Sequence, residues 1–281
     1  MLLGPGTASS LHRSLSILLL HPLLCVYRAS DEGENFIVKN MIPGEFEYQQ
    51  DLQKPLASCP NLRTVIDIIP DFELFVYHLL AVDLLQISQR PLSTETRRNI
   101  KPNNILLDYE ETTGDDIAIK SVQISNLEDA VLLPPGKNLK GCLCGNQLWR
   151  SPESWARARQ NTPSDMFSFG VVVIYVMLND MIFRVSDEGL GGDDAWWHIL
   201  RRHISYFGDE DGFKGLLQHV GEDNVFFDRL IALAGDFDAE RRESLLDLVM
   251  KMINLDPVRR IIAREVLEHP WFRHADLRQK T

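Results

Sequence analysis

Three polar side chains with possible chemical roles stand at the edges of short apolar runs. Lys39 ends one run, Asn104 precedes a second, and Asn126 follows a third. Lysine supplies a positive charge, whereas an amide oxygen is neutral and binds a hard cation such as Mg²⁺ more weakly than a carboxylate does. What they can do depends on the elements that bring them together.

The four cysteines predict no zinc site. Cys142 and Cys144 form a C-x-C pair, but no second Cys or His pair stands at zinc spacing. We therefore expect reduced thiols, as in a cytoplasmic or nuclear protein.

The predicted secondary structure changes along the chain from mostly strands to mostly helices. Strands are expected at residues 35–39, 64–69 and 73–80, and the last two should pair antiparallel. A helix is expected at residues 45–56, between the first strand and the second. Residues 164–178 carry an apolar core too long for a strand and predict a buried helix that is capped by Ser164 and Asp165. Further helical patterns follow at residues 195–206, 211–219, 224–233, 239–253 and 263–267. A small sheet-rich part before a larger helical part predicts a two-lobed α+β fold.

Charge and hydropathy narrow the class of partner. The formal net charge is -11 and the pI is about 5.2, so we expect neither a nucleic-acid nor a membrane partner. The apolar stretch at residues 15–26 is too short to span a bilayer and is interrupted by His21 and Pro22. A secretory signal cleaved near Ala29 is the alternative, but a remnant of an N-terminal strand region is the favoured interpretation.

Four motifs resemble those of serine/threonine protein kinases and stand in the family's order. Residues 256–272 (D-P-V-R-R-I-I-A-R-E-V-L-E-H-P-W-F) resemble the end of the kinase domain, and residues 164–170 (S-D-M-F-S-F-G) resemble its central helix. Residues 145–153 end in S-P-E where the family has A-P-E, and residues 101–107 (K-P-N-N-I-L-L) resemble half of the catalytic loop. The resemblance runs from about Val26 to Phe272.

This resemblance implies a two-lobed kinase-like fold, with a small antiparallel-sheet N-lobe and a larger helical C-lobe. It divides the chain into a non-family segment (1–25), an incomplete N-lobe and hinge (26–82), a C-lobe (83–275) and a tail (276–281). It also implies two structural roles. Glu153 should form a buried ion pair with Arg260, and Asp165 should accept hydrogen bonds from the catalytic-loop backbone, unless it is a plain helix cap.

The resemblance assigns the nucleotide-handling positions, with ATP and Mg²⁺ as cofactors if the domain is active. Lys39 matches the lysine that grips phosphates, and its helix partner would be Glu47 or Glu45. Lys101 matches the catalytic-loop lysine typical of serine/threonine kinases, and Asn104 matches the asparagine that binds the second metal.

Other nucleotide-handling positions have lost the residue that phosphoryl transfer needs. Asn99 replaces the catalytic Asp and cannot accept a proton. Asn126 replaces the metal-binding Asp, although Glu128 or Asp129 could substitute. The three positions that should carry the glycines of the phosphate-covering loop hold Leu19, His21 and Leu24.

Roughly one helix is also missing before Arg97, compared with the family. Three hypotheses follow: a pseudokinase or impaired serine/threonine kinase that acts on or binds a protein, an active kinase that transfers the ATP γ-phosphate to protein, or an incomplete reading of the gene. An incomplete reading of the gene could explain the two deficits, at the N-terminus and at the missing helix. It would not explain Asn126, which lies at neither, so the pseudokinase is favoured.

Overall fold

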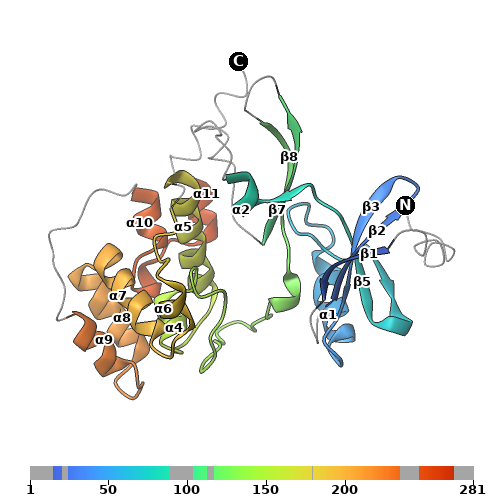
Figure 1. The fold of residues 1–281 in the computed structure, drawn as a ribbon. Helices are drawn as coiled ribbons and strands as arrows, with labels where there is room; N and C mark the ends of the chain where they lie inside the picture. Colours follow the sequence, from blue (N-terminus) through green and yellow to red (C-terminus); the bar gives the residue numbers. More distant parts are fainter. Residues whose placement is uncertain are drawn as a thin grey trace. The chain divides into compact units, whose positions relative to one another are not determined.

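The computed structural model describes residues 15–20, 25–88, 104–112, 117–178, 180–234 and 247–268. The chain forms two compact units, Met1–Leu132 and Leu133–Thr281 (Figure 1). The first contains the sheets and the second the long helices, which agrees with the predicted α+β class. Among the described residues, no helix is both long and apolar enough to cross a lipid bilayer.

The N-terminal unit is built on a five-stranded antiparallel sheet in the order β1-β2-β3-β5-β4. Side chains alternate across it, because successive residues of a strand point to opposite faces. Ile37 joins Phe75 and Tyr77 in one core, while Phe36 and Val38 join another. The strands are β1 (Leu15–Leu20), β2 (Cys25–Asp31), β3 (Glu34–Asn40), β4 (Asp67–Ile69) and β5 (Leu74–His78).

The predicted strands and helix of this unit are confirmed, and the N-terminal segment is better integrated than expected. Helix α1 (Phe46–Gln53) continues as a 3₁₀ turn at Lys54–Leu56. Strand β1 pairs with β2 up to Leu20 opposite Cys25, so residues 15–20 belong to the sheet rather than to a separate segment. His21 and Leu24, two of the expected glycine positions, lie outside the described residues.

A second, three-stranded sheet completes the N-terminal unit. It consists of β6 (Val82–Asp83), β7 (Ile105–Glu111) and β8 (Ile117–Ile124), and α2 (Leu84–Ser88) follows β6. The amide of Arg63 donates to the carbonyl of Ile124 (2.8 Å), and the amide of Ile124 donates to the carbonyl of Asn61 (2.8 Å). These bonds join β8 to the chain before β4 within the unit Met1–Leu132, and the predicted lobe boundary at Val82 stays a prediction.

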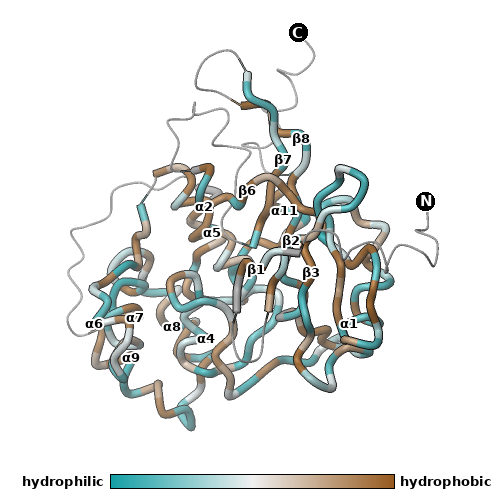
Figure 2. The backbone as a smooth tube through the Cα atoms, turned by 45° about the vertical axis from the view of Figure 1, so that its right-hand side comes forward, coloured by the Kyte–Doolittle hydropathy of each residue, from teal (hydrophilic) through white to brown (hydrophobic). Residues whose placement is uncertain are grey.

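The second unit packs its helices around the apolar α5 (Thr162–Leu178), whose hydropathy is visible in Figure 2. Helix α5 begins two residues before the predicted start. Because the helix begins at Thr162, Asp165 stands in the first turn and not at the cap. The other helices are α4 (Pro152–Trp155), α6 (Asp187–Gly191), α7 (Ala195–Phe207), α8 (Glu210–Val220), α9 (Phe227–Ala234), α10 (Asp247–Met252) and α11 (Ala263–Glu268).

Gly170 explains how α5 approaches the end of α10 so closely. A Cβ atom at this position would lie 2.6 Å from Ile253 Cγ2 and 2.8 Å from Met252 Cβ. Both neighbours are fully buried, so neither can move aside easily. The glycine of the S-D-M-F-S-F-G motif is therefore a packing requirement.

We predict that Gly170→Ala lowers the free energy of unfolding by about 1–3 kcal/mol, because overpacking outweighs the better helix propensity of alanine. Denaturant unfolding followed by circular dichroism measures this. Gly191→Ala is the control, because nothing lies within 4 Å of the new methyl group. Equal stability of the two variants would contradict the close approach.

Candidate functional site

Lys39 lies on the central strand β3, opposite Val26 on β2 and Phe75 on β5. Its ammonium group donates to Asn126 Oδ1 (3.2 Å) and pairs with Glu128 Oε1 (3.4 Å). The side chains of Lys39 and Glu128 are only 20% and 18% exposed. The predicted phosphate-gripping lysine is therefore already held by an amide and a carboxylate of its own chain.

Glu128 is fixed from several directions. The Tyr77 hydroxyl donates to Glu128 Oε1 (2.7 Å), and Gln49 Nε2 donates to the Glu128 main-chain oxygen (2.9 Å). Burial raises the pKa of Tyr77, and the Glu128 carboxylate raises it further. The Arg63 guanidinium lies 5.1 Å from the centre of the Tyr77 ring, and desolvation lowers its pKa while Tyr77 and Glu128 oppose this change.

Asn126 follows β8 in the left-handed backbone region, with φ 65° and ψ 42°. Asparagine tolerates this conformation better than most residues. The preceding Ser125 donates both its amide (2.6 Å) and its hydroxyl (3.1 Å) to the Asn104 carbonyl oxygen. The start of β7 and the end of β8 thus bring Asn104 beside the residues that meet Lys39.

The structure corrects the expected carboxylate partner of Lys39. Glu47 and Glu45 are exposed, whereas Phe46, Gln49 and Gln53 form the buried face of α1. The helix therefore presents Gln49 to this site, and Glu128 supplies the charge.

Two predicted site residues, Asn99 and Lys101, lie outside the described residues. The sequence analysis did not identify Tyr77, Arg63 or Gln49. Only Tyr77 gave a usable signal, as a hydroxyl directly after the apolar residues Leu74–Val76 of a strand, where burial would require a hydrogen-bond partner.

The described donors do not fit a fully formed site for ATP and Mg²⁺. Mg²⁺ prefers carboxylate oxygens, but Asn104 and Asn126 offer amides and Glu128 is engaged by Lys39 and Tyr77. No group of three or more His, Cys, Asp or Glu side chains suited to a metal was found in the described part of the chain. Two buried oxygens of this site, Glu128 Oε2 and Gln49 Oε1, have no hydrogen-bond partner among the described residues.

In the helical unit, the predicted ion pair between Glu153 and Arg260 is present. Arg260 Nη1 lies 2.6 Å from Glu153 Oε1, and Nη2 lies 2.8 Å from Oε2, so the pair is bidentate. Ser164 Oγ also donates to Glu153 Oε1 (2.6 Å), and Arg260 donates to the carbonyls of Asn254, Pro163 and Leu255. Desolvation would raise the pKa of Glu153, but the charge and hydrogen bonds of Arg260 lower it overall.

Asp165 has a different environment from Glu153. Asp165 is exposed, although the neighbouring Ser164 contacts the buried Glu153. The catalytic-loop residues expected to donate to it lie outside the described residues, so this role stays a prediction.

Next to the ion pair, His203 is completely buried on α7. Its ring centre lies 4.1 Å from that of Phe183 and 5.1 Å from that of Phe167, and neither ring nitrogen has a partner among the described residues. Burial, followed by the positive charge of Arg260, lowers the pKa of His203 to about 3. The ring is therefore neutral in the folded chain at all ordinary pH values.

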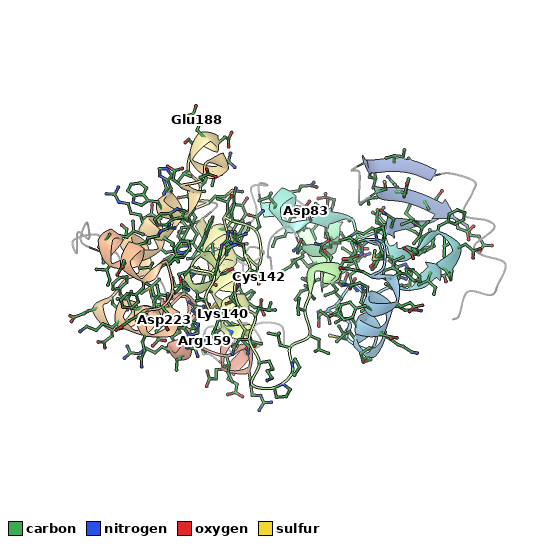
Figure 3. All side chains as sticks on the ribbon, turned by 90° about the horizontal axis from the view of Figure 1, so that it is seen from below. Asp83, Lys140, Cys142, Arg159, Glu188 and Asp223 are labelled. Atoms are coloured by element: carbon green, nitrogen blue, oxygen red, sulfur yellow. The ribbon has the colours of Figure 1, made fainter. Side chains whose placement is uncertain are left out.

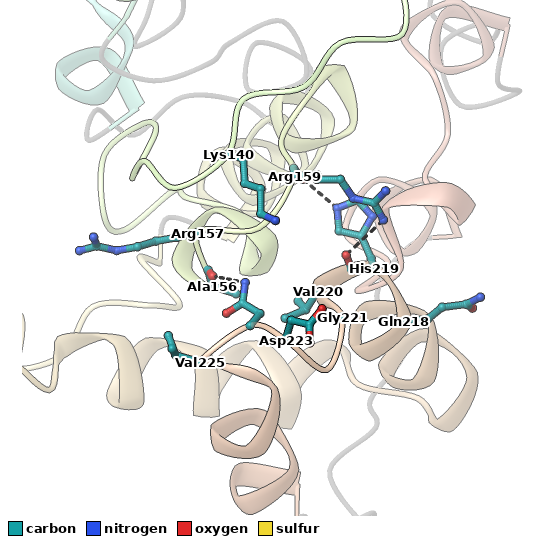
Figure 4. A pocket seen from close by; sticks show the side chains of 11 residues that line it. Lys140, Ala156, Arg157, Arg159, Gln218, His219, Val220, Gly221, Asp223 and Val225 are labelled. Carbon is teal, nitrogen blue, oxygen red and sulfur yellow. Dashed lines mark hydrogen bonds between the residues drawn. The ribbon is translucent and has the colours of Figure 1, made fainter.

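The helical unit also has a pocket of about 490 Å³ that none of the predicted site residues lines (Figure 4). Lys140, Arg159 and Asp223, which are labelled on the whole chain in Figure 3, give it mixed charge. His219 Nε2 lies 2.7 Å from the Arg159 carbonyl, and Arg159 Nη2 donates to the His219 carbonyl (3.4 Å). These contacts hold the pocket wall together and indicate no chemistry.

Comparison with known families decides the identity of the fold. The model of the family described as "Protein kinase domain" matches residues 96–272. The chain belongs to this family. The match covers β7, β8 and every described helix of the second unit. All four kinase-like motifs lie within this matched segment.

Relatives of this kinase domain include serine/threonine kinases. It is 24% identical over 298 residues to the phosphorylase b kinase gamma catalytic chain, liver/testis isoform, of Bos taurus, covering 90% of this chain and 63% of the relative. It is 26% identical over 276 residues to ribosomal protein S6 kinase alpha-2 of Homo sapiens, covering 88% and 33%. It is 26% identical over 180 residues to the probable serine/threonine-protein kinase HSL1 of Saccharomyces cerevisiae, covering 64% and 9%. The chain thus spans less than two thirds of each of these relatives.

We predict that Glu153→Gln destabilises the helical unit by about 3–5 kcal/mol, because it leaves the Arg260 charge buried without a counter-charge. Chemical unfolding measures the loss. Glu210→Gln is the control, since the pair between Glu210 and Lys214 is exposed and should contribute little. If both variants unfold at the same denaturant concentration, Glu153 and Arg260 do not hold the unit.

The lowered pKa of His203 makes the free energy of unfolding depend on pH. Unfolding exposes the ring, whose pKa then rises to about 6.5, so below that pH the unfolded chain binds one more proton than the folded chain. Stability should therefore fall as the pH drops. Relative to His203→Leu, the wild-type chain should lose about 1.5 kcal/mol between pH 6.5 and pH 5.

Unfolding free energies at both pH values test this difference. Ile199→Val, a buried change on the same helix without a titratable group, should lower stability and keep the wild-type pH dependence. A His203→Leu variant as acid-sensitive as the wild type would show that His203 is not buried in its neutral form.

Proposed function

We propose that this kinase domain is a pseudokinase or a catalytically impaired serine/threonine kinase, and that it serves mainly as a protein-binding module. The supporting observation is the contact of Lys39 with Asn126 and Glu128. In phosphoryl transfer this lysine must be available to the phosphates of ATP. An active kinase pairs this lysine with a carboxylate of the helix, but Lys39 pairs with Glu128 of the turn after β8, which Tyr77 also holds, and Glu47 on α1 is exposed.

The amides at two key positions support the same conclusion. Asn99 cannot take a proton from a substrate hydroxyl, and Asn126 cannot supply the negative charge that holds Mg²⁺ beside the phosphates. Both losses reduce catalysis independently of Lys39, because proton transfer and metal binding are separate demands.

The β1–β2 hairpin adds a steric argument. A phosphate-covering loop needs glycine so that backbone amides can approach the anion closely. Leu19 is paired with Val26 in the sheet, and the sequence has His21 and Leu24 at the other two positions. Side chains at these positions would keep the backbone amides from approaching the anion as closely as glycine allows.

The retained scaffold suits recognition of a protein, either a partner or a substrate. The acidic chain disfavours nucleic acid and anionic membrane as partners. We place the protein in the cytoplasm or nucleus, where its cysteines would remain reduced.

A second candidate is an active serine/threonine kinase that uses ATP and Mg²⁺. The observation in its favour is the buried, unpartnered Glu128 Oε2, because a buried carboxylate oxygen needs a hydrogen-bond donor or a cation. With Lys39, Lys101 and Asn104 retained, Glu128 would then replace the missing metal-binding Asp.

We predict that millimolar ATP with Mg²⁺ raises the melting temperature of the purified chain by less than about 1 °C. A ligand present at a hundred times its Kd would add about 2.7 kcal/mol, which is several degrees for a chain of this size. Differential scanning fluorimetry with and without nucleotide measures the shift.

The variant Lys39→Ala tests whether any shift arises at this site. Lys120→Ala is its control, because Lys120 forms an exposed pair with Glu110 on the second sheet. A shift of several degrees that Lys39→Ala abolishes and Lys120→Ala preserves would establish the kinase as ATP-binding and refute the proposal.

A further inference from the structure

Two thiols of the helical unit lie in contact. Cys142 Sγ and Cys144 Sγ are 3.5 Å apart, and both cysteines are reduced. A disulfide needs the sulfurs at about 2.05 Å, so rotation about the side-chain bonds can close most of the gap. Cys142 is exposed to solvent and Cys144 is half-buried.

The chain anchors each cysteine separately to the residues around α4. The Cys144 amide donates to Ser154 Oγ (3.1 Å), and Ser154 Oγ donates to the Cys144 carbonyl (3.1 Å). Arg150 Nε also donates to the Cys144 carbonyl (2.9 Å). On the other side, Gln160 Nε2 donates to the Cys142 carbonyl (2.8 Å), and the Gly141 amide donates to the Arg157 carbonyl (3.0 Å). The fold therefore holds the main chain of both cysteines in place on either side of Leu143.

We propose that Cys142 and Cys144 are a redox-active dithiol, which a hydroperoxide such as hydrogen peroxide converts to an intramolecular disulfide. The site is separate from the nucleotide-handling residues and does not depend on the proposed function. Transient disulfides of this kind are compatible with a reducing compartment, because they are reversed by thiol exchange.

The reaction has two balanced steps. The Cys142 thiol first loses its proton to solvent; its thiolate then attacks one oxygen of the peroxide, the O–O bond breaks, and the leaving hydroxide takes up a proton, so that Cys142 sulfenic acid and one water form. The Cys144 sulfur then attacks the Cys142 sulfur, and the sulfenic hydroxyl leaves as a second water with the Cys144 proton. Overall, two thiols are oxidised to one disulfide, and one peroxide is reduced to two waters.

The surroundings of the two thiols indicate which one reacts with the peroxide first. Burial raises the pKa of the Cys144 thiol to about 11, and the neighbouring Cys142 raises it further, while Arg150 opposes this change. Cys144 therefore keeps its proton and serves as the resolving thiol. Exposed Cys142 is the sulfur that a dissolved peroxide can reach.

The surrounding segment has no residue that can be phosphorylated on a hydroxyl group. Residues 129–149 contain no Ser, Thr or Tyr, so phosphorylation cannot act there. A disulfide in this segment would fix the chain next to Ser154, which follows Glu153 of the buried ion pair directly.

The test treats the full reduced chain with a small excess of hydrogen peroxide, blocks free thiols with N-ethylmaleimide, digests with trypsin and records peptide masses. Cleavage after Lys140 and Arg150 releases residues 141–150, which contain both thiols. We expect this peptide to lose two hydrogens and to escape the blocking reagent until dithiothreitol reduces it. The peptides that contain Cys25 and Cys59 should remain fully blocked and serve as internal controls.

Two variants test the assigned roles. With Cys144→Ser, dimedone should label the sulfenic acid at Cys142, whereas with Cys142→Ser the remaining Cys144 should stay unlabelled. The proposal is overturned if the wild-type peptide 141–150 remains a dithiol at peroxide levels that oxidise Cys25 or Cys59, or if Cys142 or Cys144 pairs instead with another cysteine. The wild-type result needs no substitution, so a misfolded variant cannot obscure it.

Discussion

The buried ion pair between Glu153 and Arg260 is the contact on which the helical unit depends. A charge removed from water needs a partner, and here each partner is also satisfied by further hydrogen bonds, from Ser164 to the carboxylate and from the guanidinium to main-chain carbonyls. The pair connects residues 107 positions apart in sequence, so it fixes the segment around α4 against the last helices. The requirement is structural and holds whether or not the domain transfers phosphate.

In the N-terminal unit, the partly buried charge of Lys39 also needs a partner. An active kinase pairs this lysine with a carboxylate of the helix, whereas Lys39 pairs with Glu128 of the turn after β8. Tyr77 donates to the same carboxylate and helps to hold it in place. The helical scaffold is therefore retained, while Lys39, at a position that the kinase resemblance assigns to ATP binding, contacts Asn126 and Glu128.

Much of the fold could be predicted from sequence, because strands and helices leave periodic patterns and the kinase motifs carry their own spacing. Glu153 and Arg260 were recognisable for that reason. The partner of Lys39 was not, because choosing between Glu47 and Glu128 depends on which face of α1 is buried and on the turn after β8. The start of α5 also shifted, because the helix begins two residues earlier, at Thr162. Tertiary contacts decide such details, and the sequence pattern does not contain them.

The decisive measurement is the affinity for Mg²⁺ and a fluorescent ATP analogue, titrated into the wild-type chain and into Glu128→Gln. If Glu128 neutralises Lys39, removing its charge should free the lysine and tighten nucleotide binding from a very weak wild-type level. If Glu128 is instead the metal ligand of a working kinase, the wild-type chain will bind well and Glu128→Gln will bind less. That second result would contradict the account given for this site.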